Sequence, residues 1–196
     1  FNLTTDIAQC EGSSVTNFRE IPGYAHNSST AAVRDTWRYL YNAVYRATDF
    51  IETVYGNYET FTDADKELAR IYVAEARALR ALYFFELVRW YGQVALMTDT
   101  WMSELDKSEL FPASKLAVYE YMEKELLAAI ETLPWAGESS DPRLNTSFRL
   151  TKGAAYGLLA KVYATWAGAP LKDETKWERA AWAAGQVGNS NRHHLL

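Results

Sequence analysis

Residues 74–92 read AEARALRALYFFELVRWYG, and this stretch decides the fold. Its apolar residues lie at helical spacing and almost all the way round the helix axis, which is typical of a helix buried on most of its surface. Five charged side chains stand among them, namely Glu75, Arg77, Arg80, Glu86 and Arg89. Because an unpaired buried charge is very costly, each of these side chains needs either a partner or a function.

The rest of the chain carries the same helical periodicity, and no segment shows the alternation of a convincing strand. Thr62 and Thr151 are predicted to cap helices, Gly92 to end one, and Pro112 to occupy a first turn. The sequence therefore predicts an all-α protein with five helices, over residues 30–55, 62–92, 112–133, 151–168 and 173–187.

A stripe of small residues runs along the fourth predicted helix, formed by Gly153, Gly157, Ala160, Ala164 and Ala167. A glycine inside a helix costs about 0.5–1 kcal/mol relative to alanine, so we expect a neighbouring helix to pack very close to this stripe. Antiparallel helix pairs with small residues at their crossings are typical of tetratricopeptide-like arrays. Since the helices start at uneven spacings, we predict tetratricopeptide-like antiparallel helix pairs with long loop insertions.

The charges of the second helix divide between two sides at 100° per residue. Glu75, Glu86 and Arg89 fall on one side, and Arg77 and Arg80 fall on the other. Glu86 and Arg89 can pair within the helix because they are three residues apart, whereas Glu75 needs a partner from another element. The two glutamates are roughly 16 Å apart along the axis, too far for a pair of catalytic carboxylates, which lie about 5–9.5 Å apart. We interpret all five as structural ion pairs.

Composition excludes several other classes of function. The net charge of −5 disfavours a nucleic-acid partner, and the single Cys excludes an internal disulfide framework. The chain contains no phosphate-binding glycine loop, dinucleotide fingerprint or catalytic signature motif, so no cofactor and no enzymatic activity are expected. His26 stands alone in a polar segment, and the adjacent His193 and His194 have no acidic cluster nearby, so no metal site is predicted.

Aromatic residues are abundant, at 14% of the chain. Three of them, Tyr24, Trp101 and Trp135, fall in predicted loops, where a large ring is less readily buried. A flat ring can stack on the C–H face of a sugar, so these three are the candidate ligand-binding residues; folding back onto the core is the alternative for each. The tryptophans on predicted helices are interpreted as core, and they are Trp37, Trp90, Trp166, Trp177 and Trp182.

Four motifs together resemble the SusD/RagB family. The stretch AEARALRALYFFELVRWYGQVALMT is similar to the signature helix and turn of that family, and WRYLYNAVYRATDFIE from Trp37 is similar to its first helix. RLTKGAAYGLLAKVY and YEYMEKELLAAIETLP match two further helices. Ala95 stands where the family usually has proline and Glu125 where it has aspartate, and neither change removes a known functional group.

The resemblance implies a cell-surface lipoprotein of the Bacteroidetes outer membrane, with tetratricopeptide-like helices. Such a protein binds nutrients, most often oligosaccharides, and delivers them to a SusC-like TonB-dependent transporter. It is not an enzyme, and it meets the membrane only through a lipid anchor that this chain lacks. The resemblance further implies an irregular segment at 1–29, a SusD-like N-terminal helical region at 30–188, and at 189–196 the end of a fragment.

Two alternatives remain open at this point. A SusD-like protein can bind non-glycan cargo such as peptides, and a helical repeat can serve as an adaptor acting only through protein contacts. The motifs shared with the family belong to its scaffold, so the resemblance assigns no ligand residue in this chain.

Overall fold

A computed structural model describes residues 20–21, 24–106, 110–145 and 148–192. Within these residues all regular structure is helical, as the sequence predicts. Five α-helices are joined by loops that hold two short 3₁₀ helices. The elements are α1 (Ala31–Asn57), η2 (Tyr58–Thr60), α2 (Asp63–Tyr91), η3 (Thr100–Glu104), α3 (Lys115–Thr132), α4 (Lys152–Ala167) and α5 (Lys176–Asn189).

The chain divides into two compact units, Phe1–Asn42 and Ala43–Leu196, and α1 contributes residues to both. In the first unit, the described part includes a polar turn in which Thr30 Oγ1 accepts from the Asn27 amide at 3.0 Å. Trp37 and Tyr41 lie one turn apart on α1, with ring centroids 4.8 Å from each other.

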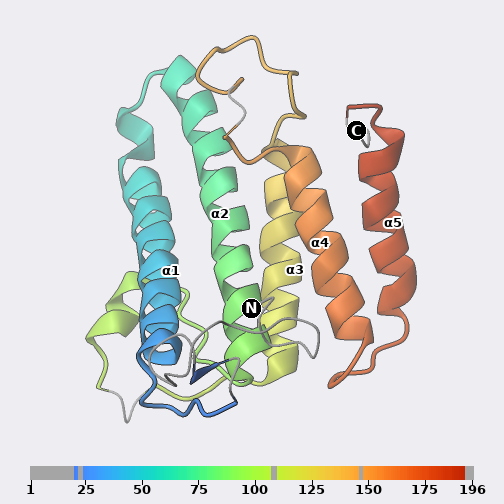
Figure 1. Cartoon of the computed structure of the whole chain (residues 1–196). Coiled ribbons are helices and arrows are strands. Elements are labelled where there is room, and N and C mark those ends of the chain that lie inside the picture. The colour runs from blue at the N-terminus through green and yellow to red at the C-terminus, as the bar shows by residue number, and fades with distance from the viewer. Residues whose placement is uncertain (1–19, 22–23, 107–109, 146–147, 193–196) are drawn as a thin grey trace. The chain divides into compact units, whose positions relative to one another are not determined.

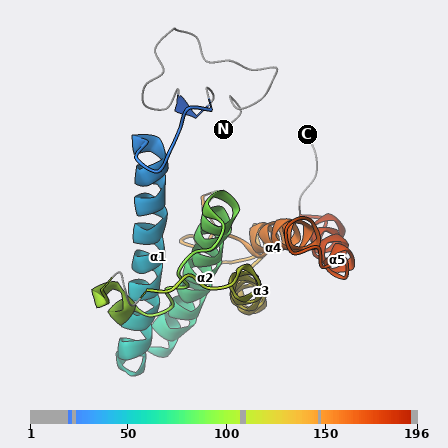
Figure 2. The same ribbon diagram turned by 90° about the horizontal axis from the view of Figure 1, so that it is seen from below.

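The second unit is a row of antiparallel helices. The α1 segment from residue 43, then α2, α3, α4 and α5 lie side by side in chain order, and each runs opposite to the one before (Figures 1 and 2). This arrangement gives successive antiparallel helix pairs, which is the tetratricopeptide-like architecture expected from the sequence. The loop between α2 and α3 and the loop between α3 and α4 are the long insertions.

Side-chain caps explain where three of the helices begin. Thr62, Ser114 and Thr151 each accept a hydrogen bond from the backbone amide three residues later, which satisfies one of the free amides of a first turn. The prediction for Pro112 is wrong, because Ser114 is the cap and α3 begins at Lys115. At the other end of α2, Gly92 adopts φ +80°, a conformation that strains any residue with a Cβ.

The core lies mainly between α2, α3 and α4. A smaller cluster of Ile51, Val73 and Ala76 joins α1 to α2. Burial of these apolar side chains is the main stabilising term of the fold. The largest fully buried side chains are Tyr163, Phe84, Leu87, Met122, Leu126, Leu133, Leu159, Val44, Val94, Val118 and Val162.

The close helix crossing expected at the α4 small-residue stripe is absent at Gly157. A Cβ placed on this glycine would meet nothing within 4 Å, so a neighbouring helix does not require the missing side chain. The helix instead buries larger residues such as Leu159, Tyr163 and Trp166 against its neighbours. At Gly157, therefore, the packing of α4 does not depend on the missing side chain, whereas Gly153 and Ala167 of the same stripe are buried.

No helix in the described part of the chain is both long and apolar enough to cross a membrane.

Candidate functional site

The charges of α2 are largely committed to holding helices and loops together. Arg80 Nη2 lies 2.6 Å from Glu125 Oε2 on α3, and both side chains are buried. Arg80 Nη1 donates to Thr48 Oγ1 on α1 at 3.0 Å and to the Thr98 carbonyl at 3.5 Å. One guanidinium thus ties α2 to two helices and to the loop after α2, which assigns Arg80 to the scaffold.

Glu75 holds the α3–α4 loop against α2. It accepts two hydrogen bonds from Arg149, the residue whose guanidinium also stacks on the Tyr72 ring at 4.5 Å. These contacts raise the pKa of Arg149, chiefly through the hydrogen bond to Glu75. At the far end of α2, Glu86 accepts from Arg89 at 2.7 Å and from the Trp90 indole at 2.8 Å.

Arg77 differs from the expectation of an ion pair. Its Nη2 donates to the Tyr55 hydroxyl at 3.5 Å, and within the described ranges no carboxylate forms an ion pair with it. Its buried Nε has no hydrogen-bond partner among the same residues. Most buried polar atoms in proteins have a hydrogen-bond partner, so an arginine with an unpaired buried nitrogen is unusual. The residues around Arg77 are therefore a candidate ligand site.

Those surroundings form a concave trough of about 520 Å³, which we call the Tyr55–Tyr58 trough. It lies where the end of α1 and η2 meet the first half of α2 and the last turn of α3. Its size falls in the range of pockets that hold small ligands. The trough is lined by Val54, Tyr55, Tyr58, Glu67, Ala69, Arg70, Val73, Ala74, Arg77, Ala128, Glu131 and Thr132.

Local structure fixes the two tyrosines on the rim. The Tyr58 hydroxyl accepts from Arg70 Nε at 3.0 Å, and Lys66 Nζ lies 5.4 Å from the Tyr58 ring centroid. Tyr55 is held in the same way, by Arg77. Arg70 and Arg77 are seven residues apart, two helical turns, so both face the α1 side of α2. Each rim tyrosine is therefore matched to one arginine.

The floor and the charges of the trough suit a small polar ligand with apolar faces. The lining includes the small apolar residues Ala69, Ala74 and Ala128, of which Ala69 and Ala74 are buried. Arg70 lies 3.8 Å from Glu67, so these two charges offset one another. The lining therefore combines apolar surface with hydrogen-bond donors and acceptors and with side chains of both charges.

A second groove, of about 550 Å³, lies between α1 and α2 and also contacts the α3–α4 loop. Its lining is largely aromatic and aliphatic, with Phe50, Tyr72 and Tyr83 among its residues. The Glu75–Arg149 pair described above lines the same groove, so those polar groups are already bonded to each other. This groove offers rings for stacking but fewer free hydrogen-bonding groups than the trough.

Of the three aromatic residues predicted to bind ligand, Trp101 and Trp135 belong to the second unit and do not converge on one site. Tyr24 is 74% exposed and belongs to the first unit. Trp101 is 59% exposed on η3, where Glu52 accepts from the Thr100 amide at 2.9 Å and holds the segment. Trp135 follows the opposite end of α3, so an 18-residue helix of roughly 27 Å separates it from Trp101.

Trp135 folds back onto the helices instead of projecting into solvent. It stacks on Tyr156 of α4 at 5.8 Å, and Tyr156 meets Trp182 of α5 edge-on at the same distance.

Burial of the helical tryptophans also departs from expectation. Trp166 is in the core, whereas Trp37, Trp90, Trp177 and Trp182 are between 38% and 51% exposed.

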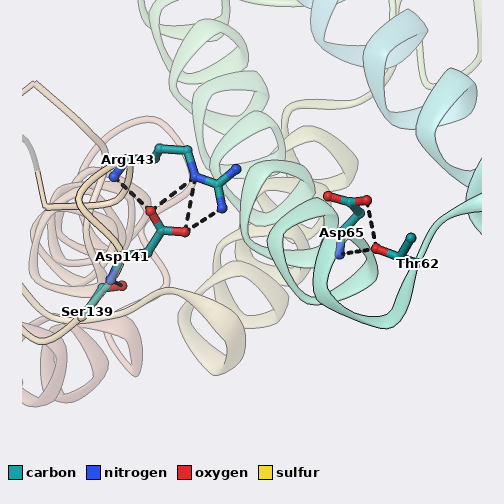
Figure 3. Close-up of polar contacts among 5 residues, drawn as sticks. All are labelled: Thr62, Asp65, Ser139, Asp141 and Arg143. Carbon is teal, nitrogen blue, oxygen red and sulfur yellow. Dashed lines mark hydrogen bonds and ion pairs between the residues drawn. The ribbon is translucent and has the colours of Figure 1, made fainter.

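No group of three or more acidic, histidine or cysteine side chains in the described ranges could hold a metal ion. Two charged residues of the α3–α4 loop, Asp141 and Arg143, pair with each other. Asp141 accepts from Arg143 at 2.7 Å, which lowers the Asp141 pKa, while Asp65 bonds Thr62 at the start of α2 (Figure 3). His26 is exposed in its turn, and residues 193 and 194 lie outside the described ranges.

Sequence reasoning missed the trough because its members come from three helices. Tyr55 and Tyr58 lie near the end of α1, and Glu131 lies in the last turn of α3. Arg77 was only a partial signal, because Arg80 in the same helix likewise has no acidic residue three or four positions away.

Comparison with known proteins identifies SusD-like relatives. A SusD-like family model described as "Starch-binding associating with outer membrane" matches residues 2–164. A SusD-like protein of Bacteroides ovatus is 30% identical over 165 residues, which cover 82% of this chain and 28% of that protein.

Two solved structures show the same fold. A SusD homolog from Bacteroides thetaiotaomicron is 47% identical, with a TM-score of 0.92 over 100% of this chain and 36% of its own. A laminarin-binding SusD-like protein is 27% identical, with a TM-score of 0.75 over 95% of this chain and 37% of its own. The chain therefore spans about a third of the length of these relatives.

Proposed function

Because this chain belongs to the SusD-like family, we propose that it is part of a cell-surface glycan-binding protein that delivers oligosaccharides to a SusC-like TonB-dependent transporter. The observation that carries the proposal is the match of residues 2–164 to a starch-binding, outer-membrane-associated family. The likeness to a laminarin-binding protein over 95% of the chain supports a glycan as the cargo.

The geometry of the second unit supports binding rather than catalysis. Glu75 is held by Arg149, and Glu86 by Arg89 and Trp90, so neither carboxylate is arranged to move a proton to a substrate. The trough offers two tyrosines, two arginines and two carboxylates beside apolar residues. Polar groups that fix the orientation of a ligand over apolar surface are the usual makeup of a small-ligand pocket.

The proposal places the protein in the outer membrane, exposed at the cell surface and held there by a lipid anchor. The family description, which associates its members with the outer membrane, supports this location. Partnership with a SusC-like transporter then accounts for the use of a binding protein there, since bound oligosaccharide still has to cross the membrane.

Native affinity electrophoresis tests the proposal. The purified chain is run in gels that contain soluble starch or laminarin, next to a plain gel and a non-binding reference protein. Retardation by at least one neutral polysaccharide is expected. Mobility unchanged in all glycan gels, together with calorimetric binding of a mixed peptide digest, would show that the cargo is peptide.

The transporter part of the proposal has its own test. The protein is tagged and purified from outer membranes in mild detergent, and the co-purifying β-barrel proteins are identified. A TonB-dependent transporter is expected at a near-equal amount. Co-purification with soluble proteins alone, and no glycan binding, would instead support the adaptor role.

A further inference from the structure

We propose that the Tyr55–Tyr58 trough is an oligosaccharide-binding subsite that selects neutral rather than acidic sugars. The inference rests on the proposed function and adds to it both a location and a ligand class. The trough is distinct from the loop residues Tyr24, Trp101 and Trp135, none of which lines it.

The two rim tyrosines each keep an unused hydrogen-bond donor. A phenol hydroxyl can accept and donate at the same time. The Tyr58 hydroxyl accepts from Arg70 and the Tyr55 hydroxyl accepts from Arg77, and neither donates to another residue in the described part of the chain. Both hydroxyl protons are therefore available to a ligand oxygen, from positions that Arg70 and Arg77 fix.

The opposite wall and the base of the trough supply the complementary groups. Glu131 is exposed on the last turn of α3, and none of the described side chains forms an ion pair with its carboxylate. Arg77 Nη1 likewise donates to none of the described residues, whereas its Nε is buried. A sugar hydroxyl is both a donor and an acceptor, so it can bond a carboxylate on one side and a phenol or guanidinium on the other.

The balance of charge decides the ligand class. The Arg70 charge is offset by Glu67 at 3.8 Å, which leaves Arg77 and Glu131 as the two charges without ion-pair partners among the described residues. An acidic sugar would gain from Arg77 but would meet the unpaired carboxylate of Glu131 in the same trough. A neutral sugar uses these groups as hydrogen-bond partners without repulsion.

The second groove is the weaker candidate for the same ligand. Its ring-bearing walls could stack on a sugar, but Arg149 and Glu75 are already joined by two hydrogen bonds and Arg149 is stacked on Tyr72. Recruiting either side chain for a ligand would break an existing contact. A ligand in the trough can bond the free hydroxyl protons of Tyr55 and Tyr58 without breaking an existing contact.

Calorimetric titration of the whole chain with maltoheptaose, laminarihexaose and trigalacturonic acid tests the inference. The variants are Tyr55→Ala and Glu131→Ala. Their controls are Tyr45→Ala on α1 and Glu120→Ala on α3, exposed residues of the same types that do not line the trough. Urea unfolding of every variant checks that the fold is kept.

We expect at least one neutral oligosaccharide to bind, and each trough variant to weaken it about tenfold, the effect of losing one or two ligand contacts. The controls should stay within about twofold of the parent chain. If both trough variants bind a neutral sugar as tightly as the parent chain does, the trough is not the subsite, while the proposed function stands. Tighter binding of trigalacturonic acid than of the neutral sugars would overturn the ligand class. If none of the three probes binds, the proposed function itself is contradicted.

Discussion

Arg80 and Glu125 face each other across the α2–α3 contact, with Nη2 and Oε2 2.6 Å apart and both side chains buried. The SusD/RagB family usually has aspartate at the position of Glu125, and the glutamate here also contacts the guanidinium. The pair, together with Thr48 and the Thr98 carbonyl, explains how a helix as apolar as α2 can carry an arginine inside the core.

Removing one member of this pair should strongly destabilise the protein. Arg80→Met leaves the Glu125 carboxylate buried without a counter-charge, and such losses cost about 3–5 kcal/mol. Urea unfolding followed by circular dichroism measures the effect. The double variant Arg80→Met with Glu125→Leu should recover most of the loss, because no buried charge is left unpaired. Equal stability of the single and double variants would contradict this account.

The pair of Glu86 and Arg89 provides a matched comparison on the same helix. Its side chains are 29% and 44% exposed, so Arg89→Ala should change the free energy of unfolding by about 1 kcal/mol or less. The same urea experiment measures both pairs. A loss at Arg89 as large as the loss at Arg80 would show that burial does not set the contribution of these ion pairs.

Two glycines, one within α4 and one directly after α2, should respond in opposite directions to alanine. At Gly157 in α4 a Cβ meets nothing within 4 Å, so Gly157→Ala should raise stability by about 0.5–1 kcal/mol through the helical preference of alanine. At Gly92, with φ +80°, alanine is strained, and Gly92→Ala should lower stability by about 1–2 kcal/mol. Thermal unfolding of the two variants checks both signs. A loss of stability in Gly157→Ala would instead support the close helix crossing that the sequence predicts there.

Alkaline pH should destabilise the fold through Tyr163. Burial and the 2.7 Å hydrogen bond to Glu123 raise its pKa above the ordinary value of about 10. Below pH ~10 the phenol is protonated in both states and the stabilisation is fully present. Above that pH the unfolded chain loses the proton and the folded chain keeps it, so the free energy of unfolding should fall by about 1.4 kcal/mol per pH unit.

Comparison with Tyr163→Phe isolates this effect from other alkaline titrations. The variant keeps the buried ring but has no proton to lose, so its stability should fall less steeply between pH 10 and 11. Urea unfolding at a series of pH values gives both slopes. Parallel slopes for the two proteins would contradict the raised Tyr163 pKa.

The loop aromatics should separate into ligand contacts and structural contacts. Trp101→Ala and Tyr24→Ala remove exposed rings, and we expect weaker binding of a retarding polysaccharide with stability unchanged within about 0.5 kcal/mol. Trp135→Ala removes a ring stacked on Tyr156 and should lower stability by about 1 kcal/mol or more. Affinity electrophoresis and urea unfolding measure the two effects, with the exposed Trp177→Ala as control. Full affinity in all three variants would refute a role for these loop residues in binding.

The sequence predicts the helices and their capping residues well, because those features depend on local chemistry. Thr62, Gly92 and Thr151 each act within one turn of the chain, so the order of residues is enough to place them. Family membership follows in the same way from the motif of residues 74–92 and three others, which the family comparison confirms.

The trough and the burial of the tryptophans could not be predicted in this way. Whether Trp166 is buried and Trp177 exposed depends on which neighbour lies against each face, and helical spacing alone does not supply that information. The partner of Glu75 is Arg149, 74 residues away in a loop, and the trough joins residues of three helices. Such sites depend on tertiary packing, which no short pattern records.

The most direct test of the central claim is hydrogen–deuterium exchange of the chain with and without a saturating neutral oligosaccharide, chosen as the one that binds in calorimetry. We predict slower exchange in peptides covering residues 54–77 and 128–132, which line the trough, and little change in α5. Protection confined to other parts of the chain at saturation would contradict the trough as the binding site. A complete lack of protection with every neutral sugar tried would contradict glycan binding by this chain.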